Sequence, residues 1–138
     1  GNSAMHKAVD YDDSSVYHYE AAIASEHLNA KTFKDTNWRK ISYWYEQLHT
    51  FEPNMFTLLN HATACIQLND LAKTYQLLNC IEAAELGQRG YLYYGCFAEY
   101  YLKKGEKDLA ISFLDKALLE TSNKLEREFL MKKREKLL

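Results

Sequence analysis

Residues that interrupt regular structure are scarce in this chain of 138 residues. It contains one proline, Pro53, and five glycines, and the β-branched residues Val, Ile and Thr number only 14. Few β-branched residues argue against a protein built from strands, and few breakers leave room for long helices. Gly87, Gly90, Gly105 and Pro53 also fall where helices would end rather than in their middles. The composition therefore predicts an all-α protein.

Cysteine is also scarce, and long apolar runs are absent. Three widely spaced cysteines, Cys65, Cys80 and Cys96, fit neither a disulfide framework nor a zinc site, which favours a reducing, cytoplasmic location. No apolar run approaches the roughly 20 residues that cross a bilayer, so no membrane contact is expected. The first residues lack the pattern of a signal peptide. We interpret residues 1–14 as an expression remnant or linker and residues 15–138 as one folded domain.

A large excess of positive or negative charge is lacking as well. The 17 basic and 19 acidic side chains leave a net charge of −2, which excludes binding of nucleic acid by bulk charge. No Gly-rich phosphate loop, His-Glu-x-x-His run or Cys-x-x-Cys pair occurs, and the five histidines share no helical face. We therefore expect no enzymatic activity, no metal site, no cofactor and no small-molecule substrate. Cys65 and Cys96 occupy apolar helical positions and are expected to be buried, inert thiols.

Apolar spacing, breakers and candidate caps divide the chain into about seven helices. The expected ranges are 15–29, 36–50, 54–68, 70–86, 90–104, 106–121 and 123–137. The candidate amino-terminal caps are Ser15, Asp35 or Thr36, Asn54, Asp70 and Asn123. Loops of one to four residues favour antiparallel neighbours, and only Ala30 to Lys34 makes a longer connection. The expected architecture is a stack of antiparallel helical hairpins with a carboxy-terminal capping helix.

A repeat with a period of about 34 residues supports this architecture. In Tyr91 to Lys124 the tetratricopeptide pattern runs without a gap, and the segment from Met55 repeats it more weakly. Short side chains would allow close helix contacts, with larger neighbours filling the remaining space. The chain resembles a tetratricopeptide array of two and a half to three units. The residues expected to hold the stack are Trp38, Ile41, Tyr45, Ala98, Tyr101, Ala110 and Ala117. Ala62 is a further short side chain of this kind, and Leu114 is a further large neighbour.

Such an array offers a concave surface formed by the first helix of each hairpin. The exposed candidates on that surface are Thr63, Gln67, Glu99 and Lys103. The last helix carries six basic and three acidic residues, and Arg127, Lys132 and Lys133 could also contact a partner. The alternative is a solvated capping helix, because Leu125, Phe129 and Leu130 already give it a face to bury. The aromatic residues of 91–101 could stack on bases, but they lack interleaved basic residues, which favours core packing.

Three stretches together are similar to a narrower group of proteins. They are Tyr19 to His27 (YEAAIASEH), Asp35 to Leu48 (DTNWRKISYWYEQL) and Asn123 to Leu137 (NKLEREFLMKKREKL). In this order they resemble the carboxy-terminal helical extension of bacterial extracytoplasmic-function RNA polymerase sigma factors. The intermediate stretches Leu59 to Ala64 (LNHATA) and Ala98 to Gly105 (AEYYLKKG) resemble the same extension. The similarity spans about residues 17–138.

The resemblance implies a regulatory domain that modulates transcription initiation through contacts with the sigma domains or the polymerase core. It also implies that the chain is the tail of a longer polypeptide whose promoter-recognition domains lie upstream of Met5. The alternative is a free-standing tetratricopeptide scaffold that binds a peptide of another protein, which the concave surface alone would equally allow. An open reading frame that extends well upstream would favour the sigma factor, and one that starts near Met5 would favour the scaffold.

Overall fold

The computed structural model describes residues 2–30 and 33–138, with the side chains of residues 15–30 and 34–138. Within these ranges the chain forms seven α-helices and two 3-10 helices, without a β-strand. The α-helices are α1 (Asn2–Asn29), α2 (Trp38–Phe51), α3 (Met55–Gln67), α4 (Leu71–Leu78), α5 (Gly90–Lys103), α6 (Lys107–Glu120) and α7 (Lys124–Leu137). The 3-10 helices are η1 (Phe33–Asp35) and η2 (Ala83–Arg89). The all-α prediction is confirmed.

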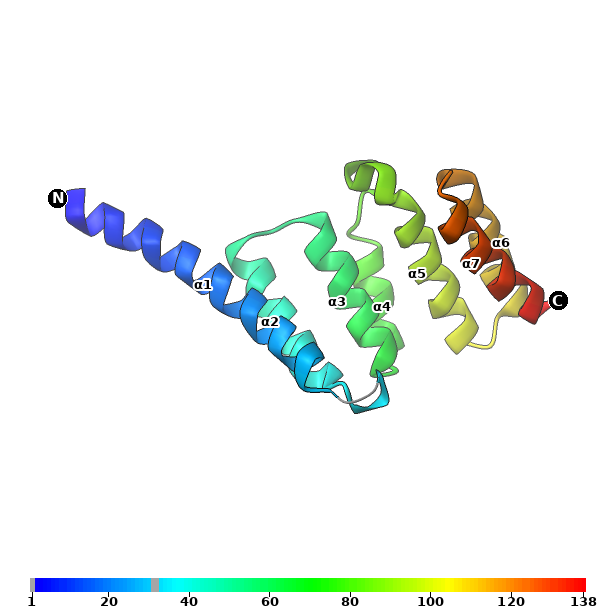
Figure 1. Ribbon diagram of the computed structural model, residues 1–138, viewed down its shortest axis with the longest axis horizontal. Helices are drawn as coiled ribbons and strands as arrows, with labels where there is room; N and C mark the ends of the chain where they lie inside the picture. The colour runs from blue at the N-terminus through cyan, green and yellow to red at the C-terminus, as the bar shows by residue number, and fades with distance from the viewer. Residues whose placement is uncertain (1, 31–32) are drawn as a thin grey trace.

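The helices follow one another along the longest axis of the molecule, and the amino-terminal part of α1 extends away from the rest (Figure 1). Packing is mostly between neighbours in sequence: α1 contacts α2, α2 contacts α3, and α5 contacts α6. The core accordingly consists of three adjoining clusters, contributed by α1 to α3, by α3 to α5, and by α5 to α7. The helices α3 and α5 therefore each supply buried side chains to two of the clusters.

Short side chains lie where these helices meet. Ala62, Ala98, Ala110 and Ala117 are all at most 3% exposed. Ala98 and Ala117 share a cluster with Leu114 and Leu130, and the ring of Phe113 packs 4.9 Å from that of Phe97 beside it. A methyl side chain permits close approach of two helices, and the larger neighbours then fill the flanks. The predicted burial of these four alanines is confirmed.

Three of the predicted amino-terminal caps are confirmed. The side-chain oxygens of Asn54, Asp70 and Asn123 accept hydrogen bonds from the backbone N–H three residues further on, at 2.8, 3.2 and 3.1 Å. Such caps satisfy amides that have no partner within the helix and are each worth about 1 kcal/mol. The cap of α2 was predicted wrongly, because Asn37 rather than Asp35 or Thr36 accepts the bond from the Lys40 amide at 3.1 Å.

The first helix also differs from expectation, because it begins at Asn2 and passes through Ser15, which therefore is not its cap. No proline or glycine occurs between Asn2 and Asn29, so nothing in the local sequence stops the helix earlier. The expected long connection from Ala30 to Lys34 lies partly outside the described residues, and η1 covers its end.

The fourth predicted helix, 70–86, is divided in two. α4 ends at Leu78, and the extended backbone of Glu82 separates it from η2, where Gly87 adopts a positive φ of 58°. Ile81 and Leu86 on either side of this break are both buried in the central cluster. The interruption lets both side chains reach the core.

Among the described residues, no helix combines the length and the apolar content that crossing a membrane would need.

Overfilling a helix contact should destabilise the fold. Ala117→Leu adds a branched side chain where the exposed fraction is 0%, so we expect the free energy of unfolding to fall by about 1–3 kcal/mol. Ala72→Leu, at an exposed position of α4, is the matched control and should change it by less than about 0.5 kcal/mol. Urea unfolding followed by circular dichroism measures both values. Equal effects of the two substitutions would contradict the packing described here.

Candidate functional site

A groove of about 460 Å³ lies on one side of the molecule and is lined by α3, α5 and α7 with one residue of α6. This volume falls in the range of ordinary ligand and peptide clefts. The lining residues are Leu59, Asn60, Thr63, Ile66, Gln67, Tyr91, Leu92, Gly95, Cys96, Glu99, Leu114, Leu125, Glu126, Phe129, Leu130 and Lys133. The groove is thus formed by alternate helices of the chain.

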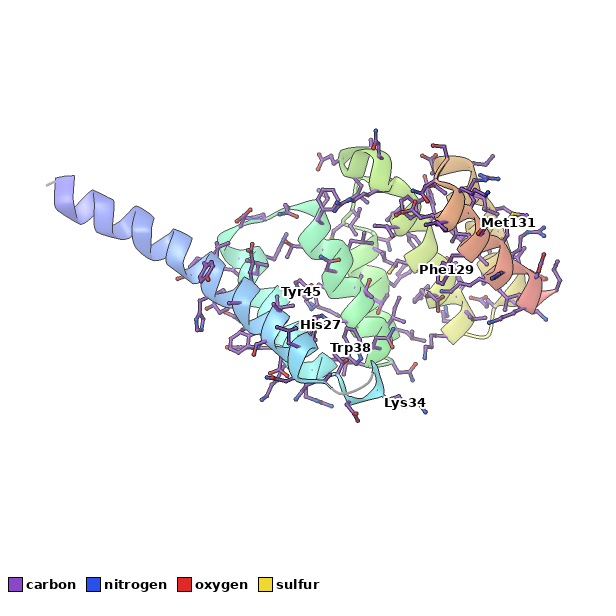
Figure 2. All side chains as sticks on the ribbon, in the orientation of Figure 1. His27, Lys34, Trp38, Tyr45, Phe129 and Met131 are labelled. Carbon is purple, nitrogen blue, oxygen red and sulfur yellow. The ribbon has the colours of Figure 1, made fainter. Side chains whose placement is uncertain are left out.

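The walls of the groove are largely apolar, and several of their side chains are open to solvent. Leu125 is 76% exposed, Phe129 is 59% exposed and Leu92 is 40% exposed. Figure 2 places Phe129 on α7, well away from the His27, Trp38 and Tyr45 side chains of α1 and α2. Scattered single apolar residues are normal at a protein surface, but a contiguous set inside a hollow is typical of an interaction site.

An ion pair crosses the groove from α5 to α7. The Lys133 ammonium donates a hydrogen bond to Glu99 Oε1, and Lys133 Nζ also lies 5.0 Å from the centre of the Phe129 ring. Both charged side chains are about one third exposed, so solvent weakens the pair to a contribution below about 1 kcal/mol. The pair positions side chains more than it stabilises the fold.

The structure brings four of the seven residues predicted to contact a partner to one place. Thr63 and Gln67 on α3, Glu99 on α5 and Lys133 on α7 all line the groove. Lys103 and Lys132 are exposed on the same two helices, α5 and α7, but do not line it. The Thr63 hydroxyl is partly engaged within its own helix, because it donates to the Leu59 carbonyl oxygen at 3.0 Å.

Arg127, the seventh predicted residue, has a different environment. Its Nη1 atom donates hydrogen bonds to the carbonyl oxygens of Leu118 and Thr121, the latter at 3.2 Å. These carbonyls lie at the end of α6, where the helix has no internal donors left. Arg127 therefore ties α7 to the carboxyl end of α6 and does not line the groove.

The expectation that Leu125, Phe129 and Leu130 form one buried face of the last helix holds only for Leu130. Leu130 is buried among α5 and α6 side chains, whereas Leu125 and Phe129 form an exposed wall of the groove. Among the described residues, α7 packs through Leu130 against α5 and α6, and Leu125 and Phe129 lie on the side of α7 that this contact leaves exposed. Sequence reasoning missed both residues and Leu92 as site residues, although their apolar character was the available signal.

Polar side chains also meet at the interface of α2 and α3. Ser42 Oγ and His61 Nε2 share a hydrogen bond of 3.0 Å, and Ser42 Oγ lies 3.8 Å from Cys65 Sγ. His61 and Cys65 are 3% and 2% exposed. Burial lowers the pKa of the His61 imidazole, aided by the nearby charge of Lys73, and raises the pKa of the Cys65 thiol. This contact packs two helices together and does not line the groove.

Cys96 is the one thiol that lines the groove. Its Sγ atom lies 3.8 Å from the Thr63 hydroxyl, and burial raises its pKa to about 12. A thiol with so high a pKa stays protonated near neutral pH and is a poor nucleophile. The predicted burial of Cys65 and Cys96 is confirmed.

Within the part of the chain that the structure describes, no three His, Cys, Asp or Glu side chains are grouped closely enough to hold a metal ion. Comparison with family models, curated proteins and solved structures finds no match to this chain. The groove is accordingly interpreted from its own residues.

The buried imidazole predicts a pH dependence of stability. Because the pKa of His61 is lowered in the folded state, the unfolded chain takes up this proton first as the pH falls below about 6.5. The free energy of unfolding should therefore decrease between about pH 7 and pH 5, and His61→Gln, which keeps a hydrogen-bonding group without titrating, should flatten this decrease. Urea titrations at several pH values measure the slope. The exposed His27→Gln should retain the slope of the unmodified protein; an unchanged slope in His61→Gln would contradict the assignment.

Proposed function

We propose that this chain is a non-catalytic, tetratricopeptide-like protein-interaction domain. We further propose that it is the carboxy-terminal regulatory extension of a bacterial extracytoplasmic-function sigma factor. In this role it modulates transcription initiation by binding the sigma domains or the RNA polymerase core. The observation that carries the proposal is the apolar groove between α3, α5 and α7, which collects four of the residues expected to contact a partner.

Two turns of the same construction support a repeated hairpin. Between α3 and α4 the Asp70 amide donates to the Cys65 carbonyl oxygen, and between α5 and α6 the Glu106 amide donates to the Tyr101 carbonyl oxygen, both at 2.9 Å. In each turn the preceding residue has a positive φ, 60° at Asn69 and 81° at Gly105. This is the Schellman arrangement that ends helices, here at corresponding places in two successive units.

The buried positions of the two units also correspond. Four buried residues of the first unit, α3 with α4, are each followed by a buried residue of the second unit, α5 with α6. The number of residues between the two members is the same in every pair. The pairs are His61 with Phe97, Ala62 with Ala98, Thr74 with Ala110, and Leu78 with Leu114. Matched burial at matched turns is the property expected of stacked repeats. It supports the tetratricopeptide-like part of the proposal.

The sigma-factor part of the proposal is supported by the ordered sequence resemblance. Its three stretches fall on α1, on η1 with α2, and on α7, so they span both ends of the array. The third stretch contributes Leu125, Phe129 and Lys133 to the groove. The last helix is thus both part of the sequence resemblance and part of the groove.

A free-standing scaffold that binds a peptide of an unrelated protein is the alternative. The groove supports this function equally, because its apolar walls and mixed charges do not depend on a covalently attached sigma domain. The two functions differ in what they bind, since only the first requires association with sigma regions or polymerase.

A charge placed on the wall of the groove should weaken association. We expect the domain to co-elute with separately produced sigma regions or with core polymerase, and Leu125→Glu to weaken this association at least about tenfold. Leu119→Glu is the matched control, because Leu119 is 86% exposed on α6 and does not line the groove. It should leave association unchanged. Size-exclusion chromatography and fluorescence anisotropy measure both variants.

Absence of association with sigma regions and with polymerase under all conditions would overturn the sigma-factor proposal and leave the scaffold. If Leu125→Glu and Leu119→Glu weaken association equally while circular dichroism shows both to be folded, the groove is not the binding surface.

A further inference from the structure

A second hollow continues the groove toward the carboxyl ends of α5 and α7. It has a volume of about 380 Å³ and shares Glu99, Leu114 and Lys133 with the groove. Its other lining residues include Leu102 and Lys136. In Figure 1 the carboxyl ends of both helices lie toward the same edge of the molecule. The two hollows form one apolar track with the Glu99–Lys133 pair at its middle.

The charges along this track are unevenly distributed. Glu99 is paired with Lys133, and Glu126 accepts hydrogen bonds from the hydroxyls of Tyr91 and Thr121. Lys136, by contrast, lines the second hollow without a side-chain partner among the described residues. Exposed Lys103 lies one helical turn beyond Glu99 and next to the lining residue Leu102; it lines neither hollow and also has no side-chain partner among the described residues. The track therefore has an apolar end at Leu92 and Leu125, and its other end carries Lys136 in the lining, with exposed Lys103 on α5 outside it.

The lining also determines which backbone conformation an occupant can adopt. The lining residues belong almost entirely to α-helices, whose interior backbone groups are already hydrogen bonded to one another. An extended peptide would leave its N–H and C=O groups without partners against apolar walls, whereas a helix satisfies them internally. About 460 Å³ would hold only about one turn of a helix some 10 Å across, so a helix would lay one face into the groove.

We propose that the track binds an amphipathic helix of a partner protein, with its apolar face against Leu92, Leu125 and Phe129 and acidic side chains at Lys103 and Lys136. Charge complementarity selects an acidic partner, because the acidic side chains lining the track are already engaged. This inference rests on the proposed function only in taking the groove as the binding surface. It adds the conformation and the charge of the partner.

Three synthetic peptides of about the length of α7, 14 residues, test the inference. The first has leucines at helical spacing with glutamates toward one end, the second replaces the glutamates by lysines, and the third scrambles the leucine spacing. Fluorescence anisotropy should show binding of the acidic peptide, at least about tenfold weaker binding of the basic peptide, and loss of binding on scrambling. Added salt should weaken the acidic complex.

Substitutions in the chain test which lysines are responsible for the preference for an acidic peptide. Lys103→Gln combined with Lys136→Gln should reduce affinity for the acidic peptide about tenfold. The matched control is Lys34→Gln combined with Arg39→Gln, two exposed cations on η1 and α2 (Figure 2 labels Lys34), and it should leave affinity unchanged. Circular dichroism verifies that both variants are folded.

Equal or stronger binding of the basic peptide, or binding of neither peptide, would overturn the inference. If the peptide test fails but the sigma regions bind and Leu125→Glu prevents this binding, the proposed function still stands. A dimer in sedimentation velocity that Phe129→Glu dissociates, without peptide binding, would assign the groove to a second copy of the chain and also overturn the inference.

Discussion

Close approach of neighbouring helices at buried alanines is the constraint on which the rest of the structure depends. Ala98 on α5 and Ala117 on α6 have almost no exposed surface, and they share their cluster with Leu114. Because a methyl group occupies so little of the contact, the helix axes come close and the larger side chains are displaced to the flanks. The aromatic rings of Tyr94, Phe97 and Phe113 occupy that flank. A bulkier residue at either alanine would move α5, α6 and the groove together.

The groove is a consequence of this packing. α7 is held to its neighbours by buried Leu130 and by the Arg127 bonds to the end of α6. These contacts all lie on one side of the helix. The opposite side, with Leu125 and Phe129, is left facing the surface next to α5 and α3. A last helix that completes the core on one side thus supplies an apolar wall on the other.

The fold was largely accessible from the sequence because its determinants are local. Asn54, Asp70 and Asn123 are caps by side-chain chemistry, and the alanines mark helix contacts by their regular recurrence. The division of the fourth helix was not accessible, since residues 70–86 contain no proline and the break serves the burial of Ile81 and Leu86. The roles of Leu125, Phe129 and Arg127 depend on which neighbour α7 meets, and periodicity alone does not contain that information.

The central claim is that the groove binds the partner protein. Crosslinking from a residue in the groove tests this claim most directly. In the protein inside cells, p-benzoylphenylalanine would replace either Phe129 in the groove or Phe51 on α2, both of which are solvent exposed. The account predicts crosslinks to sigma regions or another protein from position 129 and none from position 51. Crosslinks from position 51 with none from position 129 would contradict it.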